Sequence, residues 1–219
     1  VLCCTPSYAL YLADAIKDSG LPREEFQLKV GAFGAEPWTE NMRHEIEEKL
    51  GIKAYDIYGL SEIAGPGVGY ECECQNGTHL NEDHYFPEII DPNTLQPVEP
   101  GQTGELVFTH LTKEGMPLLR YRTRDLTALH HDKCSCGRTL VRMDRILGRS
   151  DDMFIIKGVN IFPMQVEKIL VQFPELGSNY LITLETVNNQ DEMIVEVELS
   201  DLSTDNYIAV SYTHLTLPT

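Results

Sequence analysis

The sequence predicts an α/β protein with three successive parts: a parallel β-α-β portion, a small antiparallel sheet or open barrel, and a smaller C-terminal α/β domain. The first part alternates segments of helical and strand periodicity. From about Val68 the chain changes to short alternating strands separated by Asp-Pro-Asn and Pro-Gly turn signals. Beyond Met153 the pattern becomes strand, helix, strand, strand, which predicts a unit able to fold separately.

Two helices are expected in the first part, each with its own start and stop signals. For the first, Thr5 is the expected N-cap, Pro6 lies in the first turn and Gly20 follows the end. The second is expected between a cap at Thr39 and a stop at Gly51.

Short buried strands are expected on both sides of the second helix, over residues 26–34 and 52–59. Strand, helix, strand at this spacing is typical of a parallel β-α-β unit. Ligands bind outside the carboxyl ends of such strands. The segments GAFGAEPW (31–38) and YGLSE (58–62) include these ends, so both are candidates for a ligand site.

A domain boundary is expected between Arg149 and Asp152, where a short polar segment follows a glycine. The predicted domains are residues 1–148 and 149–210. The last nine residues, SYTHLTLPT, carry Thr and Pro where a further helix would be expected, so 211–219 is predicted to be a non-native tail. The chain starts in mid-pattern without Met, which predicts a portion of a longer protein.

The net charge of −17 argues against nucleic acid and against an anionic membrane as the main partner. The sequence has no run of about 20 apolar residues that could span a membrane. An anionic small ligand is still compatible with this charge, because arginines concentrate in one region: Arg120, Arg122, Arg124, Arg138, Arg142, Arg145 and Arg149.

The segment from Tyr58 to Glu62 has two interpretations. An aromatic ring, a hydroxyl and a carboxylate at one strand end could stack on a purine and contact a magnesium-bound phosphate. Alternatively, Ser61 and Glu62 cap an ordinary turn, and on these residues alone the capped turn is favoured.

Two later segments are also open to two interpretations. In RYRTRD, Asp125 could accept the hydroxyls of a ribose and the arginines could hold phosphate, or the group could be a surface salt-bridge network. In GRSDD (148–152), the polar residues could form a hinge between two domains or an ordinary loop.

Four of the six cysteines are candidates for a zinc site. Cys134-Ser-Cys136 followed by glycine forms a tight knuckle, and Cys72 or Cys74 with His79 could supply the other ligands. The single intervening residue is tighter than the usual spacing of roughly two to four. His130 and His131 compete for the nitrogen ligand, and reduced buried cysteines are the alternative. The adjacent pair at positions 3 and 4 is expected in a strand core.

Together and in this order, the segments resemble the phenylacetate–coenzyme A ligases, a branch of the adenylate-forming superfamily. The segments that carry the resemblance are GAFGAEPW, YDIYGLSEIAGPGV, PEIIDP, GELVFTHLTKEGMPLLRYRTRDL, CSCGRT and GRSDDMFIIKGVNIFPMQVE, between Gly31 and Glu167. Members of the family are considerably longer, so the chain resembles their central and C-terminal portion, with the small domain as a lid. The resemblance implies that ATP activates an aryl acid as its adenylate and that coenzyme A then displaces AMP.

The resemblance also implies roles for individual residues at the nucleotide. The adenine-side loop would be Gly34, Ala35, Glu36 and Pro37. Tyr58 and Gly59 would lie against the adenine, Ser61 would contact the α-phosphate, and Glu62 would hold Mg²⁺.

Further roles follow from the same resemblance. Asp125 would bind the ribose, Arg145 and Arg149 would lie near ribose or phosphate, Asp151 would be the hinge, and Gly158 would lie beside the pantetheine arm of coenzyme A. The wall of the aryl-acid pocket would be Ile63, Ala64, Gly65 and Pro66. The structural zinc ligands would be Cys72, His79, Cys134 and Cys136, with Cys74 as a substitute for Cys72.

The chain departs from the family pattern in two places. It lacks the Ser/Thr/Gly-rich loop that holds the β- and γ-phosphates, and it lacks the C-terminal lysine that assists adenylation; Lys157 belongs to a different position. The 219-residue chain alone is therefore expected to show no ligase turnover.

The expected partners are an aryl acid and coenzyme A, with ATP or AMP, Mg²⁺ and a structural Zn²⁺ as cofactors. The resemblance is compatible with a homodimer of the whole protein, and the absence of secretory features predicts a cytoplasmic location. Two other functions are considered: a zinc-stabilised binding module with a degenerate nucleotide site, and an adenylating enzyme that loads a carrier protein.

Overall fold

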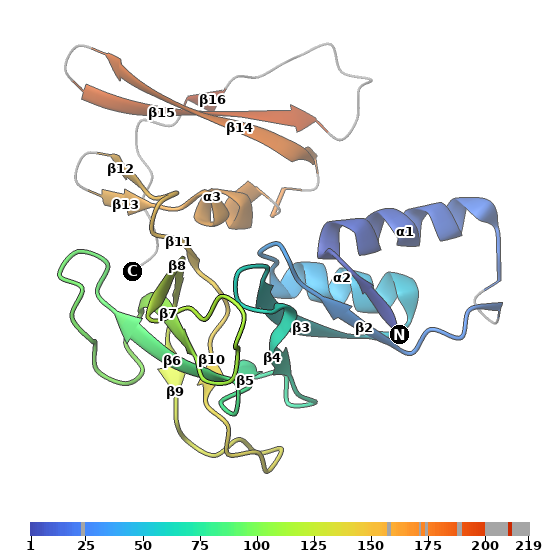
Figure 1. Ribbon diagram of the computed structural model, residues 1–219. Coiled ribbons are helices and arrows are strands. Elements are labelled where there is room, and N and C mark those ends of the chain that lie inside the picture. Colours follow the sequence, from blue (N-terminus) through green and yellow to red (C-terminus); the bar gives the residue numbers. More distant parts are fainter. Residues whose placement is uncertain are drawn as a thin grey trace. The chain divides into compact units, whose positions relative to one another are not determined.

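The computed structural model describes residues 1–22, 25–156, 159–170, 172–173, 175–187, 190–199 and 210–211. It is a mixed α/β structure, as the sequence predicts (Figure 1). The chain divides into two compact units, Val1–Ser150 and Asp151–Thr219.

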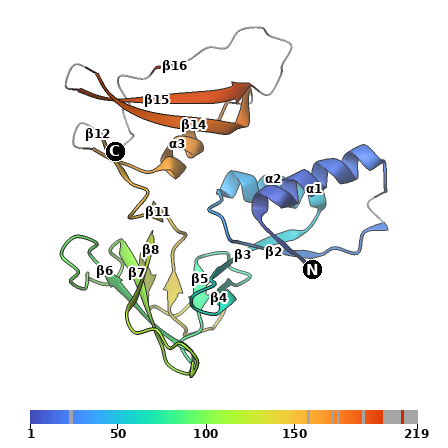
Figure 2. The same ribbon diagram turned by 45° about the horizontal axis from the view of Figure 1, so that its top comes forward.

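The first unit begins with alternating strands and helices. These are β1 (Leu2–Cys4), α1 (Pro6–Ser19), β2 (Val30–Phe33), α2 (Glu40–Leu50) and β3 (Lys53–Leu60). The three strands pair in parallel, in the order β1, β2, β3. Figures 1 and 2 show α1 and α2 side by side on one face of these strands. The predicted parallel β-α-β portion is confirmed.

Both helices begin and end at the predicted residues. The side chains of Thr5 and Thr39 each accept a main-chain N–H of the first turn. Gly20 and Gly51 follow the helices with φ of 67° and 60°, the left-handed conformation that glycine adopts without steric cost.

The two helices pack on the strands through one apolar cluster. Its buried members are Ala9, Ala13, Phe33, Trp38, Ile46, Leu50, Ile52 and Ala54. Leu2 and Cys4 of β1 lie against this cluster, but Cys3 is exposed, contrary to the prediction. Successive side chains of a strand point to opposite faces, so Cys3 points away from the face that the helices cover.

The sheet continues beyond β3 with antiparallel strands. These are β4 (Gly65–Glu71), β5 (Thr78–Leu80), β10 (Arg142–Met143) and β9 (Leu129–His130), which complete a seven-stranded sheet in the order β1-β2-β3-β4-β5-β10-β9. The parallel and antiparallel parts, which the sequence pattern suggests are separate, thus share one sheet. The change of pairing occurs at β3.

A second, antiparallel sheet has the strand order β11-β8-β7-β6. Its strands are β6 (Tyr85–Ile90), β7 (Gly104–His110), β8 (Tyr121–Thr127) and β11 (Gly148–Arg149). A core of Ile63, Val68, Leu80, Tyr85, Ile89, Leu106, Phe108, Leu129, Val141 and Met143 joins it to the first sheet. The predicted antiparallel sheet is confirmed, and the described strands do not close into a barrel.

Among the described strands, β6 is the last on one side of this second sheet. The Val98 N–H donates to the Ile89 carbonyl at 3.2 Å, so the chain that follows the 91–95 turn covers part of the outer edge. Pro87 lies in the middle of the strand, two residues before Ile89.

The second unit contains β12 (Phe154–Ile156), β13 (Val159–Ile161), α3 (Pro163–Leu170), β14 (Leu176–Val187), β15 (Gln190–Leu199) and β16 (Val210–Ser211). The sequence pattern predicts this order except for β13 and β16. Its own small core consists of Ile156, Ile161, Val166 and Met193. Except for Ser211, the predicted non-native tail lies outside the described residues. Among the described helices, none has the length and apolar character needed to cross a membrane.

Candidate functional site

The loops that follow β2 and β3 lie at the same edge of the sheet, because these strands are parallel neighbours. A side chain on Gly34 would collide with the main chain at Ile57 of β3, so only glycine fits this close approach. The next residue, Ala35, has a φ of 69°, in the left-handed region that non-glycine residues rarely adopt. The predicted adenine-side loop therefore has a constrained main chain.

The side chain of Glu36 in this loop is bound to the first helix. Its carboxylate accepts the Ser7 N–H at 2.6 Å. A carboxylate at a helix N-terminus is favourable because the first N–H groups have no partner within the helix. Pro37 and Ala35 are exposed.

Tyr58 and Asp125 meet although they are 67 positions apart in the chain. The Tyr58 hydroxyl donates to Oδ2 of Asp125 at 2.5 Å. The tyrosine ring packs against Phe108 with ring centroids 6.3 Å apart. Burial, together with the Asp125 carboxylate, raises the pKa of Tyr58 far above its usual range, so the hydroxyl is a permanent donor.

A bulge in β8 gives Asp125 its direction. The pairing with β7 shifts register between Glu105 and Val107, and Arg124 has a φ of 71°. The Thr123 hydroxyl stabilises the bulge by accepting the Asp125 N–H at 3.0 Å. Bulges of this kind redirect side chains and are frequent next to active sites.

Arg149 lies opposite Asp125 on the neighbouring strand β11. Its Nη1 is 3.6 Å from Oδ1 of Asp125 and donates to the Thr123 carbonyl at 3.4 Å. Tyr58, Asp125 and Arg149, which the sequence analysis places in one site, are therefore brought together.

The turn between β3 and β4 carries Ser61 and Glu62, and both are exposed. Ile63, in the same turn, is fully buried in the core, while Ala64 and Pro66 are exposed. The predicted pocket wall therefore has one core residue and two surface residues, joined by the half-buried Gly65 at the start of β4.

His110, the last residue of β7, and Lys113, in the loop that follows, hold this turn in place. Lys113 Nζ donates to the Glu62 and Ile63 carbonyls at 3.2 and 3.1 Å. The Leu118 N–H donates to Nδ1 of buried His110 at 2.9 Å. Nε2 of His110 must then carry the proton, and it donates to the Ile63 carbonyl at 2.8 Å.

Arg145 contacts the loop after β2. It donates to the Trp38 carbonyl at 3.1 Å and pairs with Glu40 at 2.6 Å. The guanidinium carbons of Arg145 and Arg43 lie 5.0 and 4.8 Å from the centre of the Trp38 ring, a distance at which cations are attracted to aromatic rings.

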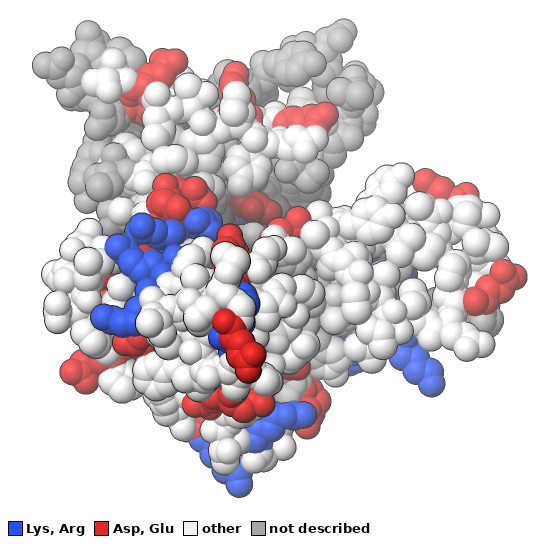
Figure 3. Space-filling view, in the orientation of Figure 1, with Lys and Arg blue, Asp and Glu red and all other residues white. Residues whose placement is uncertain are grey.

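Figure 3 shows Lys and Arg side chains gathered over the sheet of β7, β8 and β11, with acidic side chains beside them. Each of the seven arginines named from the sequence lies within 4.0 Å of a carboxylate oxygen: Arg120 with Glu88, Arg122 and Arg124 with Glu105, Arg138 with Glu73, Arg142 with Asp132, Arg145 with Glu40, and Arg149 with Asp125. Both interpretations of RYRTRD thus have support, since the arginines are paired and Asp125 faces Tyr58.

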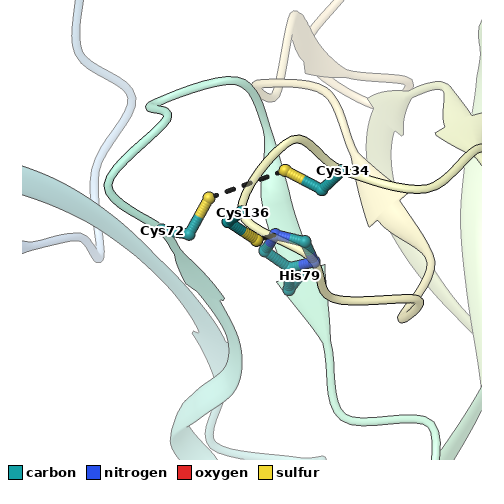
Figure 4. Close-up of side chains that lie close together, drawn as sticks. All are labelled: Cys72, His79, Cys134 and Cys136. Atoms are coloured by element: carbon teal, nitrogen blue, oxygen red, sulfur yellow. Dashed lines mark hydrogen bonds between the residues drawn. The ribbon is translucent and has the colours of Figure 1, made fainter.

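Four side chains of types that bind metals converge from the end of β4, from β5 and from the β9–β10 loop. The ligand atoms of Cys72, His79, Cys134 and Cys136 all lie within 4.8 Å of one another, and Figure 4 shows the side chains pointing toward a common centre. The Cys72 and Cys134 sulfurs are 3.8 Å apart, and Cys136 Sγ is 3.6 Å from His79 Nε2. Three thiols and one imidazole form a donor set typical of structural zinc.

Two of the competing ligands, Cys74 and His130, have other partners. The Ser135 hydroxyl donates to the Cys74 sulfur at 3.1 Å, and His130 pairs with Asp144 at 2.9 Å.

Burial raises the pKa of Cys72 to about 12, whereas the Arg138 N–H hydrogen bond lowers the pKa of Cys136 to about 7.

Two predicted residues belong to the second unit. Asp151 is its first residue and is exposed. Gly158, like Lys157, lies outside the described residues.

Sequence reasoning did not single out several residues that lie beside these positions, namely Trp38, Asp56, Glu105, His110 and Lys113. The signal for Glu105 was a charged residue in the apolar strand GELVF. The contacts of the others depend on segments distant in the sequence.

The chain is similar to known proteins over most of its length. Residues 158–214 match the family model "AMP-binding enzyme C-terminal domain". The chain is 52% identical, over 92% of its length, to phenylacetate-coenzyme A ligase from Thermus thermophilus, and 50% identical, over 91%, to the ligase of the same description from Escherichia coli. It spans 45% of the length of each.

A solved structure of 2-hydroxyisobutyryl-CoA ligase, in the postadenylation state in complex with 2-HIB-AMP, superposes with a TM-score of 0.80 at 33% identity. The match covers 91% of this chain and 43% of the other. Over nine-tenths of its length, the chain is therefore a homologue of phenylacetate–coenzyme A ligases and spans somewhat less than half of such a protein.

Proposed function

We propose that the whole protein containing this chain is an AMP-forming ligase for phenylacetate or a related aryl acid. In the first step the acid's carboxylate attacks the α-phosphate of ATP, and pyrophosphate leaves. In the second step the thiol of coenzyme A attacks the acyl carbon and loses its proton, and AMP leaves. The relatives named above support this reaction class.

The observation that carries the proposal is the hydrogen bond between Tyr58 and Asp125. It joins the end of β3 to the bulge of β8, beside the loop that follows β2. An aromatic ring, a buried carboxylate and a constrained loop at one sheet edge are suited to a nucleoside.

In this proposal Asp125 binds the two ribose hydroxyls. A carboxylate accepts hydrogen bonds at about four lone-pair sites, a chemistry that suits the hydroxyl donors of a ribose. Arg149 would offset negative charge that develops at the phosphate. The Gly34–Pro37 loop, with Gly59, would border the adenine, and Arg145 supports that loop through Trp38.

Ser61 and Glu62 are proposed to face the phosphates. Lys113 contacts the main-chain oxygen of Glu62, and the exposed carboxylate is the kind of oxygen donor that Mg²⁺ prefers. Bound Mg²⁺ would neutralise charge on the phosphates. Ala64, Gly65 and Pro66 are proposed to line the acid pocket, with Ile63 supporting them from the core, and Asp151 is proposed as the hinge.

ATP–pyrophosphate exchange with phenylacetate, measured on the whole protein, tests the proposal. Glu62→Gln should lower the exchange rate by about 10²–10³-fold, because it removes a charged ligand at the site of developing charge. Glu114→Gln, at an exposed carboxylate of a different loop, is the matched control. Exchange that is absent from the wild type, or that Glu62→Gln leaves unchanged, contradicts the proposal.

A structural zinc ion held by Cys72, His79, Cys134 and Cys136 is proposed as well. Metal analysis should find about one zinc ion per chain, and a chelator should lower the melting temperature, because these ligands join three separate segments. Cys136→Ser should reproduce the effect of the chelator. Cys3→Ser should not, because Cys3 is exposed and distant in the sequence from the four proposed ligands. Equal melting temperatures for both variants would contradict a structural role.

We propose a cytoplasmic location, since the six cysteines, all in the described part of the chain, form no disulfide. We further propose that residues 1–148 are the C-terminal part of the large nucleotide-binding domain and that 149–210 begin the small lid domain.

A further inference from the structure

Glu105 of β7 is a fully buried carboxylate that none of the proposed roles explains. Burying an ionised group is costly unless charged or hydrogen-bonding partners surround it. Here Arg122 donates from Nε to Oε1 and from Nη2 to Oε2, both at 2.7 Å. Arg124 Nη1 is 3.8 Å from Oε2. Burial by itself would raise the pKa of Glu105, but these partners hold the pKa below its ordinary value.

A further partner of Glu105 is Ser150, the last residue of the first unit. The Ser150 hydroxyl donates to Oε2 at 3.0 Å. The Ser150 N–H donates to the Arg124 carbonyl at 2.7 Å, on the bulge that directs Asp125. Ser150 is thus held by its side chain to β7 and by its main chain to β8.

This attachment matters because β11 is very short. It has two residues, Gly148 and Arg149, and among the described strands it pairs with β8 and lies at the edge of its sheet. So short an edge strand has few ladder hydrogen bonds of its own. The contacts of Ser150 therefore add to the Leu147 N–H, which donates to the Leu126 carbonyl at 2.9 Å, in keeping β11 beside β8.

We propose that Glu105 is a positioning residue of the nucleotide site: by holding Ser150, its buried carboxylate keeps Arg149 in register with Asp125 at the end of the first unit. The effect on nucleotide binding rests on the function proposed above. The effect on the local order of β11 does not.

Amide hydrogen exchange on the whole protein tests the local part. Ser150→Ala removes the hydroxyl and keeps the main-chain bond, so exchange in peptides that cover 147–150 should rise about tenfold, as expected for the loss of one hydrogen bond to a charged group. Ser150→Thr keeps a hydroxyl and should restore the protection. Ser19→Ala, which removes a serine hydrogen bond at the end of α1, is the matched control.

AMP binding measured by calorimetry on the same variants tests the positioning role. Ser150→Ala should weaken AMP binding about fivefold or more and Ser150→Thr should not, because only the former loses the contact with Glu105. Glu105→Gln should act in the same direction, with Glu88→Gln, the partner of Arg120 on β6, as its control.

The outcomes separate the two proposals. Exchange at 147–150 that is the same in Ser150→Ala and wild type overturns the inference, and so does increased exchange with unchanged AMP affinity. A wild type that binds no AMP contradicts the proposed function and with it the positioning role, while the exchange data still decide whether Glu105 orders β11.

Discussion

The carboxyl group of Asp56 in β3 experiences opposing charges. The negative charge of Glu71 raises its pKa, and the positive charges of Arg145 and Arg43 lower it. Burial, and to a smaller extent the charge of Glu71, raise the pKa of Asp56 to about 6. The group therefore changes its charge within the pH range in which enzymes are usually studied.

Because the pKa of Asp56 is raised, ionising this group lowers the free energy of unfolding, and Asp56→Asn should remove that pH-dependent loss. Between about pH 4 and 6 the folded chain keeps a proton on Asp56 that the unfolded chain has lost, so the free energy of unfolding falls as the pH rises through this window. From pH 4 to 7 the stability of Asp56→Asn relative to wild type should increase by about 2–3 kcal/mol. Urea unfolding at several pH values measures it, and a constant difference would contradict the assigned pKa.

At the same scale, the residues that sequence reasoning identifies best are those with local functions. The caps at Thr5 and Thr39 and the glycine stops act within one turn, so their pattern is complete in a short window. The hydrogen bond from Tyr58 to Asp125 spans 67 positions, and the contacts of His110 depend on the conformations of two loops. These could not be derived from a local pattern.

Among the elements, the close approach of β3 and β4 is sensitive to a single methyl group. The pairing is irregular between Tyr58 and Gly59, and a side chain on Gly59 would collide with the Gly65 carbonyl. Because backbone cannot move aside as a flexible side chain can, Gly59→Ala should lower the free energy of unfolding by about 1–3 kcal/mol.

Chemical denaturation of Gly59→Ala beside Gly115→Ala checks this prediction. Gly115 has an ordinary φ and no heavy atom within 4 Å of an added Cβ. Gly115→Ala therefore measures the effect of replacing a glycine where no collision occurs. Equal unfolding midpoints for the two variants would mean that the turn between β3 and β4 can relax.

The strands also show which features of the fold sequence periodicity could not predict. The βαβ unit and the run of short strands were predicted from periodicity, but their union in one seven-stranded sheet was not. Strands β9, β10 and β11 have two residues each, too short for any periodicity to reveal.

For the whole molecule, the two compact units have separate cores. We therefore expect them to unfold separately. Val166→Ala, in the core of the second unit, should destabilise that unit by about 1–3 kcal/mol without moving the transition of the first.

The single tryptophan, Trp38, lies in the first unit and is 6% exposed, so its fluorescence follows that unit, while circular dichroism follows both. Val68→Ala, the same change in the core of the first unit, should move the fluorescence transition. If Val166→Ala moves it equally, the two units unfold as one.

The outer edge of β6 bears on how copies of this chain behave at high concentration. Since the Ile89 carbonyl faces outward to Val98, the main chain of Pro87, two residues earlier, faces outward as well. Proline has no N–H, so this edge lacks one hydrogen-bond donor in its middle for pairing with another strand. The 97–98 segment also covers the end of the edge. Sheet-to-sheet polymerisation through β6 is thereby disfavoured, even though Phe86 beside it is 55% exposed.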